Sequence, residues 1–354
     1  MILTVTPNPS LDRTYEVPVL ERGAVLRAVV DRLDPGGKGV NVSRAVAAVG
    51  VRTTAVLPLG GPTGTLLAEL LATEGVDVTA VSVAGQTRSN VSIVEPDGTL
   101  TKVNAPGPAL TEAESALLLD TVRTCADSPD WIAACGSLPP GLPPHWYAEV
   151  VDRARATGAR IALDTSGPAL TEALSARPDV VKPNAAELAE AVGRPLHTLG
   201  DVAAAAEELR SRGAGAVLAS LGADGQLLAS AEGIFHGTAP VAAVRSSAGA
   251  GDAALAGFLV AGGSGPAALA SALAHGAAAV RLPGSAMPAP ADLRPEAVRI
   301  TPRPPLDQYL TEPAEPAEPA APAVPGGRAG VWVEPMAPPV GPVDPTGPIE
   351  PTAV

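Results

Sequence analysis

Residues 245–260 place a glycine-rich turn and a carboxylate directly before a long apolar run. The turn is formed by Gly249, Ala250 and Gly251, and Asp252 follows it. A glycine-rich turn that begins a helix leaves several backbone N–H groups pointing outward at the positive end of the helix dipole, where they bind phosphate or a developing oxyanion. A carboxylate in the first helical turn stays ionised and can accept a proton. The segment therefore predicts anion binding combined with proton transfer.

The same residues also allow a purely structural interpretation. Ser246 or Ser247 would cap the helix, and Asp252 would only complement its dipole. Short motifs have many false matches, so the rest of the chain must distinguish a helix cap from a catalytic site.

A second glycine-rich segment, Gly36-Gly37-Lys38-Gly39, lies shortly before Asn41. It is not a Walker A loop, because glycine follows the lysine where that motif requires serine or threonine. Glycines allow close approach of the backbone to a ligand, the lysine adds positive charge, and the Asn41 amide both donates and accepts hydrogen bonds. The alternative is a helix start with a solvated lysine.

The elements that must position these residues alternate between strands and helices. Buried strands are predicted at residues 2–6, 53–58, 77–82, 130–135, 160–164, 179–181 and 215–219. Helical patterns lie between most of them, which predicts a parallel sheet covered by helices on both faces. The notable polar clusters follow predicted strands, so they should meet at one edge of the sheet. Asp12 follows the first strand and is a candidate ligand-binding residue at this edge. The alternative is that Asp12 is an ordinary turn aspartate.

Residues 13–34 and 87–104 interrupt this alternation with short strands, which predicts a small second sheet that lies over the main one as a lid. Arg88 and Lys102 fall on the lid. Arginine suits bidentate recognition of phosphate, although each cation alone is more often a solvated strand residue.

The composition excludes several classes of function. The chain has 354 residues, 46% hydrophobic and 2% aromatic, with a net charge of −13, so neither counterion release nor base stacking favours nucleic-acid binding. The four histidines lack the spacing of a structural zinc site. The start lacks the features of a signal peptide, and no apolar run approaches the ~20 residues of a membrane span. We therefore expect a cytoplasmic protein that does not bind membranes.

Residues 312–354 differ in composition from the rest of the chain. Proline recurs at about every third position, and the segment contains six acidic residues but only one arginine. Such a composition favours polyproline II and cannot bury a core. We expect a disordered tail after a folded domain of residues 1–311.

Seven motifs occur together in the order and spacing of the PfkB (ribokinase-like) carbohydrate kinases, which the chain resembles over about residues 1–310. The resemblance is strongest to the branch with the 1-phosphofructokinases and tagatose-6-phosphate kinases. The motifs are residues 6–12, 36–44, 87–90, 136–139, 182–187, 220–222 and 249–252. The sequence departs from the family pattern around the last motif, where Ser247-Ala248 and Ala253 replace the usual Thr-Val and Ser.

The resemblance implies a three-layer αβα sandwich with a mainly parallel sheet and a β-sheet lid. It implies ATP- and Mg²⁺-dependent phosphorylation of a ketohexose phosphate. Fructose 1-phosphate, giving fructose 1,6-bisphosphate, is the favoured substrate, and tagatose 6-phosphate and fructose 6-phosphate are the alternatives. A weakly catalytic sugar-phosphate sensor or scaffold that uses its tail is an alternative of another class. A homodimer through the lid is the expected assembly.

The resemblance also assigns roles. Asp252 is the general base, and the N–H groups of Gly249, Ala250 and Gly251 stabilise the transferring phosphoryl group. The substrate residues are Asp12, Gly36, Gly37, Lys38, Asn41, Arg88, Lys102 and Ser137, with Arg27 as a helper. The nucleotide residues are Lys182, Asn184, Ser220, Gly222 and Gly225. Asn184 and Glu187 govern Mg²⁺, through water because magnesium dehydrates reluctantly.

Overall fold

The main sheet has ten strands, and seven neighbouring strands run parallel from β12 to β5. The computed structural model describes residues 1–125 and 129–314. In spatial order the strands are β15 (Arg299–Thr301), β14 (Gly233–Thr238), β13 (Gln226–Ser230), β12 (Ala216–Ser220), β10 (Val180–Val181), β9 (Arg160–Asp164), β8 (Trp131–Cys135), β1 (Ile2–Val5), β4 (Thr53–Leu59) and β5 (Asp77–Ser82). The central strands are short apolar runs buried on both faces, as parallel strands usually are.

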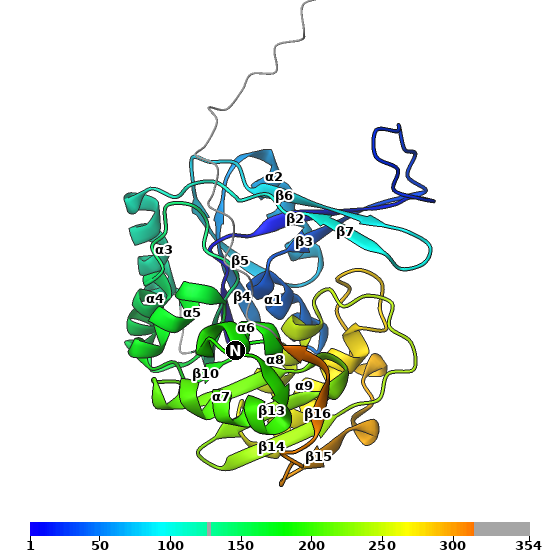
Figure 1. Cartoon of the computed structure of the whole chain (residues 1–354). Coiled ribbons are helices and arrows are strands. Elements are labelled where there is room, and N and C mark those ends of the chain that lie inside the picture. The colour runs from blue at the N-terminus through cyan, green and yellow to red at the C-terminus, as the bar shows by residue number, and fades with distance from the viewer. Residues whose placement is uncertain (126–128, 315–354) are drawn as a thin grey trace, which may run out of the picture. The chain divides into compact units, whose positions relative to one another are not determined.

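Helices cover both faces of this sheet, so the predicted three-layer sandwich is confirmed (Figure 1). One face packs against α3 (Glu112–Thr124), α4 (Trp146–Arg155), α5 (Gly167–Ala173), α6 (Ala185–Val192) and α7 (Leu199–Ser211). The other packs against α1 (Lys38–Ala48), α2 (Gly61–Thr73), α8 (Ala250–Val260) and α9 (Gly265–Ala279). Strand β1 shows the alternation: Leu3 and Val5 join the first core, whereas Ile2 joins the second.

The order of the strands reverses between β1 and β8. From β1 the chain proceeds through β4 to β5 on one side, and from β8 it proceeds through β9, β10 and β12 on the other. Open α/β sheets bind ligands outside the carboxyl ends of the strands at such a reversal. The candidate residues after β1, β9, β10 and β12 therefore lie along the carboxyl edge of the parallel strands, and those after β1 lie at the reversal itself.

The predicted lid is a separate four-stranded sheet, which Figure 1 shows at the upper right. Its order is β3 (Val30–Gly36), β2 (Ser10–Glu16), β6 (Arg88–Val94) and β7 (Leu100–Val103). Strand β2 pairs with β6 over its whole length, with Ser10 opposite Arg88 and Asp12 opposite Asn90. The lid strands thus bring the segment after β1 beside Arg88.

A small two-stranded sheet changes the expected end of the domain. Strand β16 (Tyr309–Ala314) pairs with β11 (Leu196–Thr198), so residues 312–314 continue the folded part beyond the predicted boundary at 311. Thr311 also donates its backbone N–H and its hydroxyl to the carboxylate of Asp224, at 2.7 and 2.8 Å. The remainder of the predicted tail, residues 315–354, lies outside the described residues.

Among the described residues, no helix is long and apolar enough to span a bilayer.

Candidate active site

Helix α8 begins at the glycine turn without a side-chain cap. Its N-cap residue is Gly249, with φ of +75°, a conformation that glycine adopts without strain. The hydroxyl of Ser246 instead accepts a hydrogen bond from the N–H of Ala248. The structural interpretation in which Ser246 or Ser247 caps this helix is therefore wrong, and within the described residues no side-chain cap satisfies the N–H groups of its first turn.

Asp252 is buried, with 8% of its surface exposed, and accepts a hydrogen bond of 2.8 Å from the Asn41 amide. Burial and the nearby charge of Asp164 raise the pKa of Asp252 to about 6, against the opposing effects of Lys182, Asn41 and Lys38. A carboxylate with such a pKa is ionised at neutral pH and remains a competent proton acceptor.

Asp164, at the carboxyl end of β9, is fully buried between two ammonium groups. Lys38 Nζ lies 2.8 Å from one of its oxygens and Lys182 Nζ lies 2.8 Å from the other. Burial raises the pKa of Asp164, but the two lysines outweigh it and hold the pKa below its usual value. Lys38 also contacts Glu187 at 3.2 Å, and the two carboxylates raise the pKa of Lys38 despite the opposing effect of burial.

The glycine turn lies beside one of these ammonium groups. A Cβ atom placed on Gly251 would be 3.3 Å from Lys182 Nζ. Fixed positive charge and the N–H groups at the start of α8 are thus neighbours, which suits an anionic ligand.

The carboxylate of Asp12 is held by the lid. Ser10 Oγ and Asn90 Nδ2 donate to the same Asp12 oxygen, at 2.7 and 2.8 Å. A Cβ atom on Gly36 would overlap this carboxylate, so Gly36 leaves room for Asp12 as well as for a ligand. Asn90 was present in a predicted motif but not among the predicted site residues.

Arg88 is partly buried and fixed by backbone carbonyls. Its guanidinium donates to Ala105 O at 2.7 Å and to Asn8 O at 2.9 Å. Burial lowers the pKa of Arg88, while the charge of Asp12 acts in the opposite direction. Its buried Nε has no partner among the described residues. Backbone carbonyls therefore fix the guanidinium of Arg88, and Asp12 lies close enough for its charge to act on the Arg88 pKa.

Three other predicted substrate residues are exposed. Lys102 lies on β7, opposite Ser92, and Arg27 lies in the irregular segment between β2 and β3. Neither makes an ion pair within the part of the chain that the structure describes. Ser137 follows β8 and accepts a hydrogen bond of 3.4 Å from the Asn8 amide. The structure thus connects Ser137, but not Lys102 or Arg27, to the Asp12 and Arg88 region through Asn8.

The predicted nucleotide residues follow neighbouring strands. Asn184 and Glu187 form a reciprocal capping box at the start of α6. Asn184 forms a parallel bridge with Ser220, so the ends of β10 and β12 are adjacent. Gly222 and Gly225 follow with φ of +59° and +86°. A Cβ on Gly225 would overlap the carbonyl of Gly237, which explains that glycine by packing.

Within the described residues, no cluster of three or more acidic, histidine or cysteine side chains is suited to hold a metal ion. The side-chain oxygens of Asn184 and Glu187 accept hydrogen bonds from each other's backbone N–H groups, and Glu187 also accepts one from Lys38. Their oxygens fit contacts to a hydrated magnesium ion rather than a complete protein cage.

The chain belongs to the PfkB carbohydrate kinases. A family model described as "pfkB family carbohydrate kinase" matches residues 10–292. The fold and the residues at the sheet reversal therefore belong to a sugar kinase, and the predicted family membership is confirmed.

Individual relatives include 1-phosphofructokinase of Rhodobacter capsulatus, which is 42% identical over 73% of this chain and 82% of that protein. The ATP-dependent 6-phosphofructokinase isozyme 2 of Mycobacterium tuberculosis is 40% identical over 73% of this chain and 77% of that protein. Among solved structures, phosphofructokinase-2 from Escherichia coli in complex with potassium has a TM-score of 0.78 and 34% identity, covering 82% of this chain and 96% of that one. These relatives support a sugar-phosphate kinase.

The raised pKa of Asp252 predicts that its charge destabilises the folded protein. At pH 8 the Asp252 carboxyl is ionised in both the folded and the unfolded protein, but its charge is less stable in the buried site than in water. Near pH 4 the carboxyl is neutral in the folded protein, so this penalty disappears. Asp252→Asn should therefore increase the free energy of unfolding at pH 8 by about 1–3 kcal/mol, and the gain should shrink as the pH falls through 6 toward 4. Urea unfolding at several pH values measures this difference. A variant that is less stable than the parent at pH 8 would contradict the prediction.

Proposed function

We propose that this protein transfers the γ-phosphoryl group of ATP to fructose 1-phosphate, giving fructose 1,6-bisphosphate and ADP. The observation that carries the proposal is the buried Asp252 at the uncapped glycine-led start of α8, hydrogen-bonded to Asn41. Support for the substrate comes from the relatives named 1-phosphofructokinase and from Arg88, a cation suited to a phosphate already present on the sugar.

In this mechanism the substrate hydroxyl loses its proton to Asp252. The hydroxyl oxygen forms a bond to the γ-phosphorus, and the bond between that phosphorus and the oxygen bridging to ADP breaks. Phosphoryl transfer mainly requires alignment and charge stabilisation. The N–H groups of Gly249, Ala250 and Gly251 and the neighbouring Lys182 ammonium supply that stabilisation, and Asp164 keeps the ammonium in place.

The other side chains bind and orient the two substrates. Asp12, held by Asn90, accepts hydrogen bonds from sugar hydroxyls, and Asn41 positions the sugar beside the base. Arg88, Lys38 and Ser137 serve the sugar phosphate, and Ser220, Gly222 and Gly225 serve the nucleotide. Mg²⁺ bound by the nucleotide phosphates would neutralise their charge, with Asn184 and Glu187 in contact through water.

A coupled assay of ADP formation with ATP and Mg²⁺ tests the substrate. We expect turnover with fructose 1-phosphate to exceed that with tagatose 6-phosphate or fructose 6-phosphate. Asp252→Asn should lower kcat by about two orders of magnitude or more while nucleotide binding is retained. No turnover with fructose 1-phosphate, alongside turnover with another ketohexose phosphate, would overturn the substrate. Retained activity in D252N would overturn the general base.

The sensor or scaffold alternative is tested by ending the chain after Ala314. This truncation keeps β16 and its bond between Thr311 and Asp224. A kinase that does not depend on its tail should keep its kcat and KM. Loss of cellular function in the truncated protein with full kinase activity in vitro would instead favour the scaffold.

We also propose that two copies pair through the lid. Val103 of β7 and Val29, which directly precedes β3, are 61% and 72% exposed, and burying such apolar surface favours association. Light scattering should give a particle mass of twice the chain mass of 35.1 kDa. Replacing both valines with glutamate should reduce the measured mass to that of a single chain. A doubly substituted protein that keeps the larger mass would exclude the lid as the interface.

A further inference from the structure

Arg44 lies in the middle of α1 and is almost fully buried, with 5% of its surface exposed. Its Nε donates to one oxygen of Glu74 at 2.7 Å, and its second terminal nitrogen donates to the other oxygen at 3.0 Å. This bidentate pair fixes the plane of the guanidinium. Glu74 is the residue that ends α2, so the pair joins α1 to α2.

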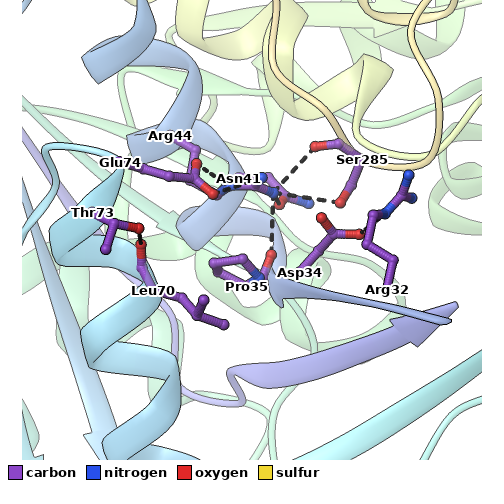
Figure 2. Close-up of polar contacts among 9 residues, drawn as sticks. All are labelled: Arg32, Asp34, Pro35, Asn41, Arg44, Leu70, Thr73, Glu74 and Ser285. Atoms are coloured by element: carbon purple, nitrogen blue, oxygen red, sulfur yellow. Dashed lines mark hydrogen bonds and ion pairs between the residues drawn. The ribbon is translucent and has the colours of Figure 1, made fainter.

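The remaining terminal nitrogen of Arg44 lies among four acceptors on three residues from different parts of the chain, as Figure 2 shows. These acceptors are the carbonyl of Pro35 at 3.2 Å, the carbonyl and the hydroxyl of Ser285 at 3.1 and 3.4 Å, and the amide oxygen of Asn41 at 3.3 Å. Pro35 belongs to lid strand β3, and Ser285 lies in the segment after α9. One guanidinium group therefore connects the lid, that segment and the residue that contacts Asp252.

The contacts with Arg44 and with Asp252 both favour one orientation of the Asn41 amide. Its oxygen faces the guanidinium, and its NH₂ group donates to Asp252 at 2.8 Å. The oxygen and nitrogen of an amide are similar in size, so their hydrogen-bond partners decide the orientation. In the flipped orientation the NH₂ group would face a cation and the oxygen would face a carboxylate, and both contacts are unfavourable.

We propose that Arg44, held by Glu74, is a positioning residue that keeps the Asn41 amide donating to the carboxylate of Asp252. The inference rests on the proposed role of Asp252 as the general base. Among the described residues Arg44 bonds to Glu74, Pro35, Asn41 and Ser285 but not to Asp252, so it acts on the base through Asn41. Because it also binds Pro35 and Ser285, it fixes the orientation of the amide relative to the end of lid strand β3.

A pH profile distinguishes this role from simple packing. The groups that face Asp252 are Asn41 and Lys38 of α1, Asp164 at the end of β9, Lys182 after β10 and the buried thiol of Cys135 on β8. Of these, the Asn41 hydrogen bond depends on Arg44. Since that bond favours the ionised carboxylate, its loss should raise the pKa of Asp252 and move the acid limb of kcat to higher pH.

The experiment uses Arg44→Lys, which keeps the positive charge in the buried site but lacks the planar fork. We expect kcat to fall by about 10- to 100-fold, as misorientation of a catalytic group does, and the acid limb to move upward. In a double-mutant cycle, R44K should add little to the effect of Asn41→Ala, because Arg44 acts through that amide. Glu74→Gln, which frees the guanidinium, should move the acid limb in the same direction by a smaller amount.

Arg210→Lys is the matched control. Arg210 of α7 also binds both oxygens of a carboxylate, Glu207, and a backbone carbonyl, that of Gly215. Its substitution should leave the pH profile unchanged. An unshifted acid limb in R44K and E74Q, or additive effects of N41A and R44K, would overturn the role of Arg44. Full activity of D252N would instead overturn the general base, so the two failures are distinguishable.

Discussion

Asp164 is a fully buried carboxylate that binds two lysines from separate parts of the chain. An unpaired buried charge would destabilise the fold by several kcal/mol. The ends of β9 and β10 and the start of α1 must therefore stay close together. This constraint also sets the electrostatics of the site. It keeps one ammonium beside the glycine turn of α8 and the other beside Glu187, and it adds negative charge near Asp252, which helps to raise the pKa of that carboxyl.

Much of the main sheet could be predicted because local sequence patterns determine its strands. The strands of the parallel sheet are short apolar runs followed by polar clusters, and strand β9 was predicted with its observed bounds, 160–164. The carboxyl ends of parallel strands meet at one edge whatever the details of packing. The lid was predictable for a similar reason, since the turn around Asp97-Gly98 separates two alternating segments.

The parts that could not be predicted depend on contacts between distant residues. Arg44 sits within an apolar helical pattern, and its partners Glu74 and Ser285 lie 30 and 241 positions away. Asp164 was recognised only as the end of a strand, because nothing local shows that Lys38 reaches it. Strand β16 contains Pro313, and proline argues against a strand except at an edge; its partner β11 lies more than a hundred residues earlier.

The features that equip α8 for chemistry are unfavourable for folding. Its first turn has no side-chain cap, and its carboxylate is buried with a raised pKa, whereas caps and solvated charges stabilise most helices. The apolar remainder of α8 compensates, because residues 253–259 are all buried against the sheet and neighbouring helices. In the proposed reaction, the transferring phosphoryl group would satisfy the N–H groups, and a substrate hydroxyl would donate to the carboxylate. The first turn of α8 therefore keeps unsatisfied polar groups, while the rest of the helix is fully packed. Arg44 and Asp164, which lie outside α8, contact Asn41 and Lys182 beside that turn.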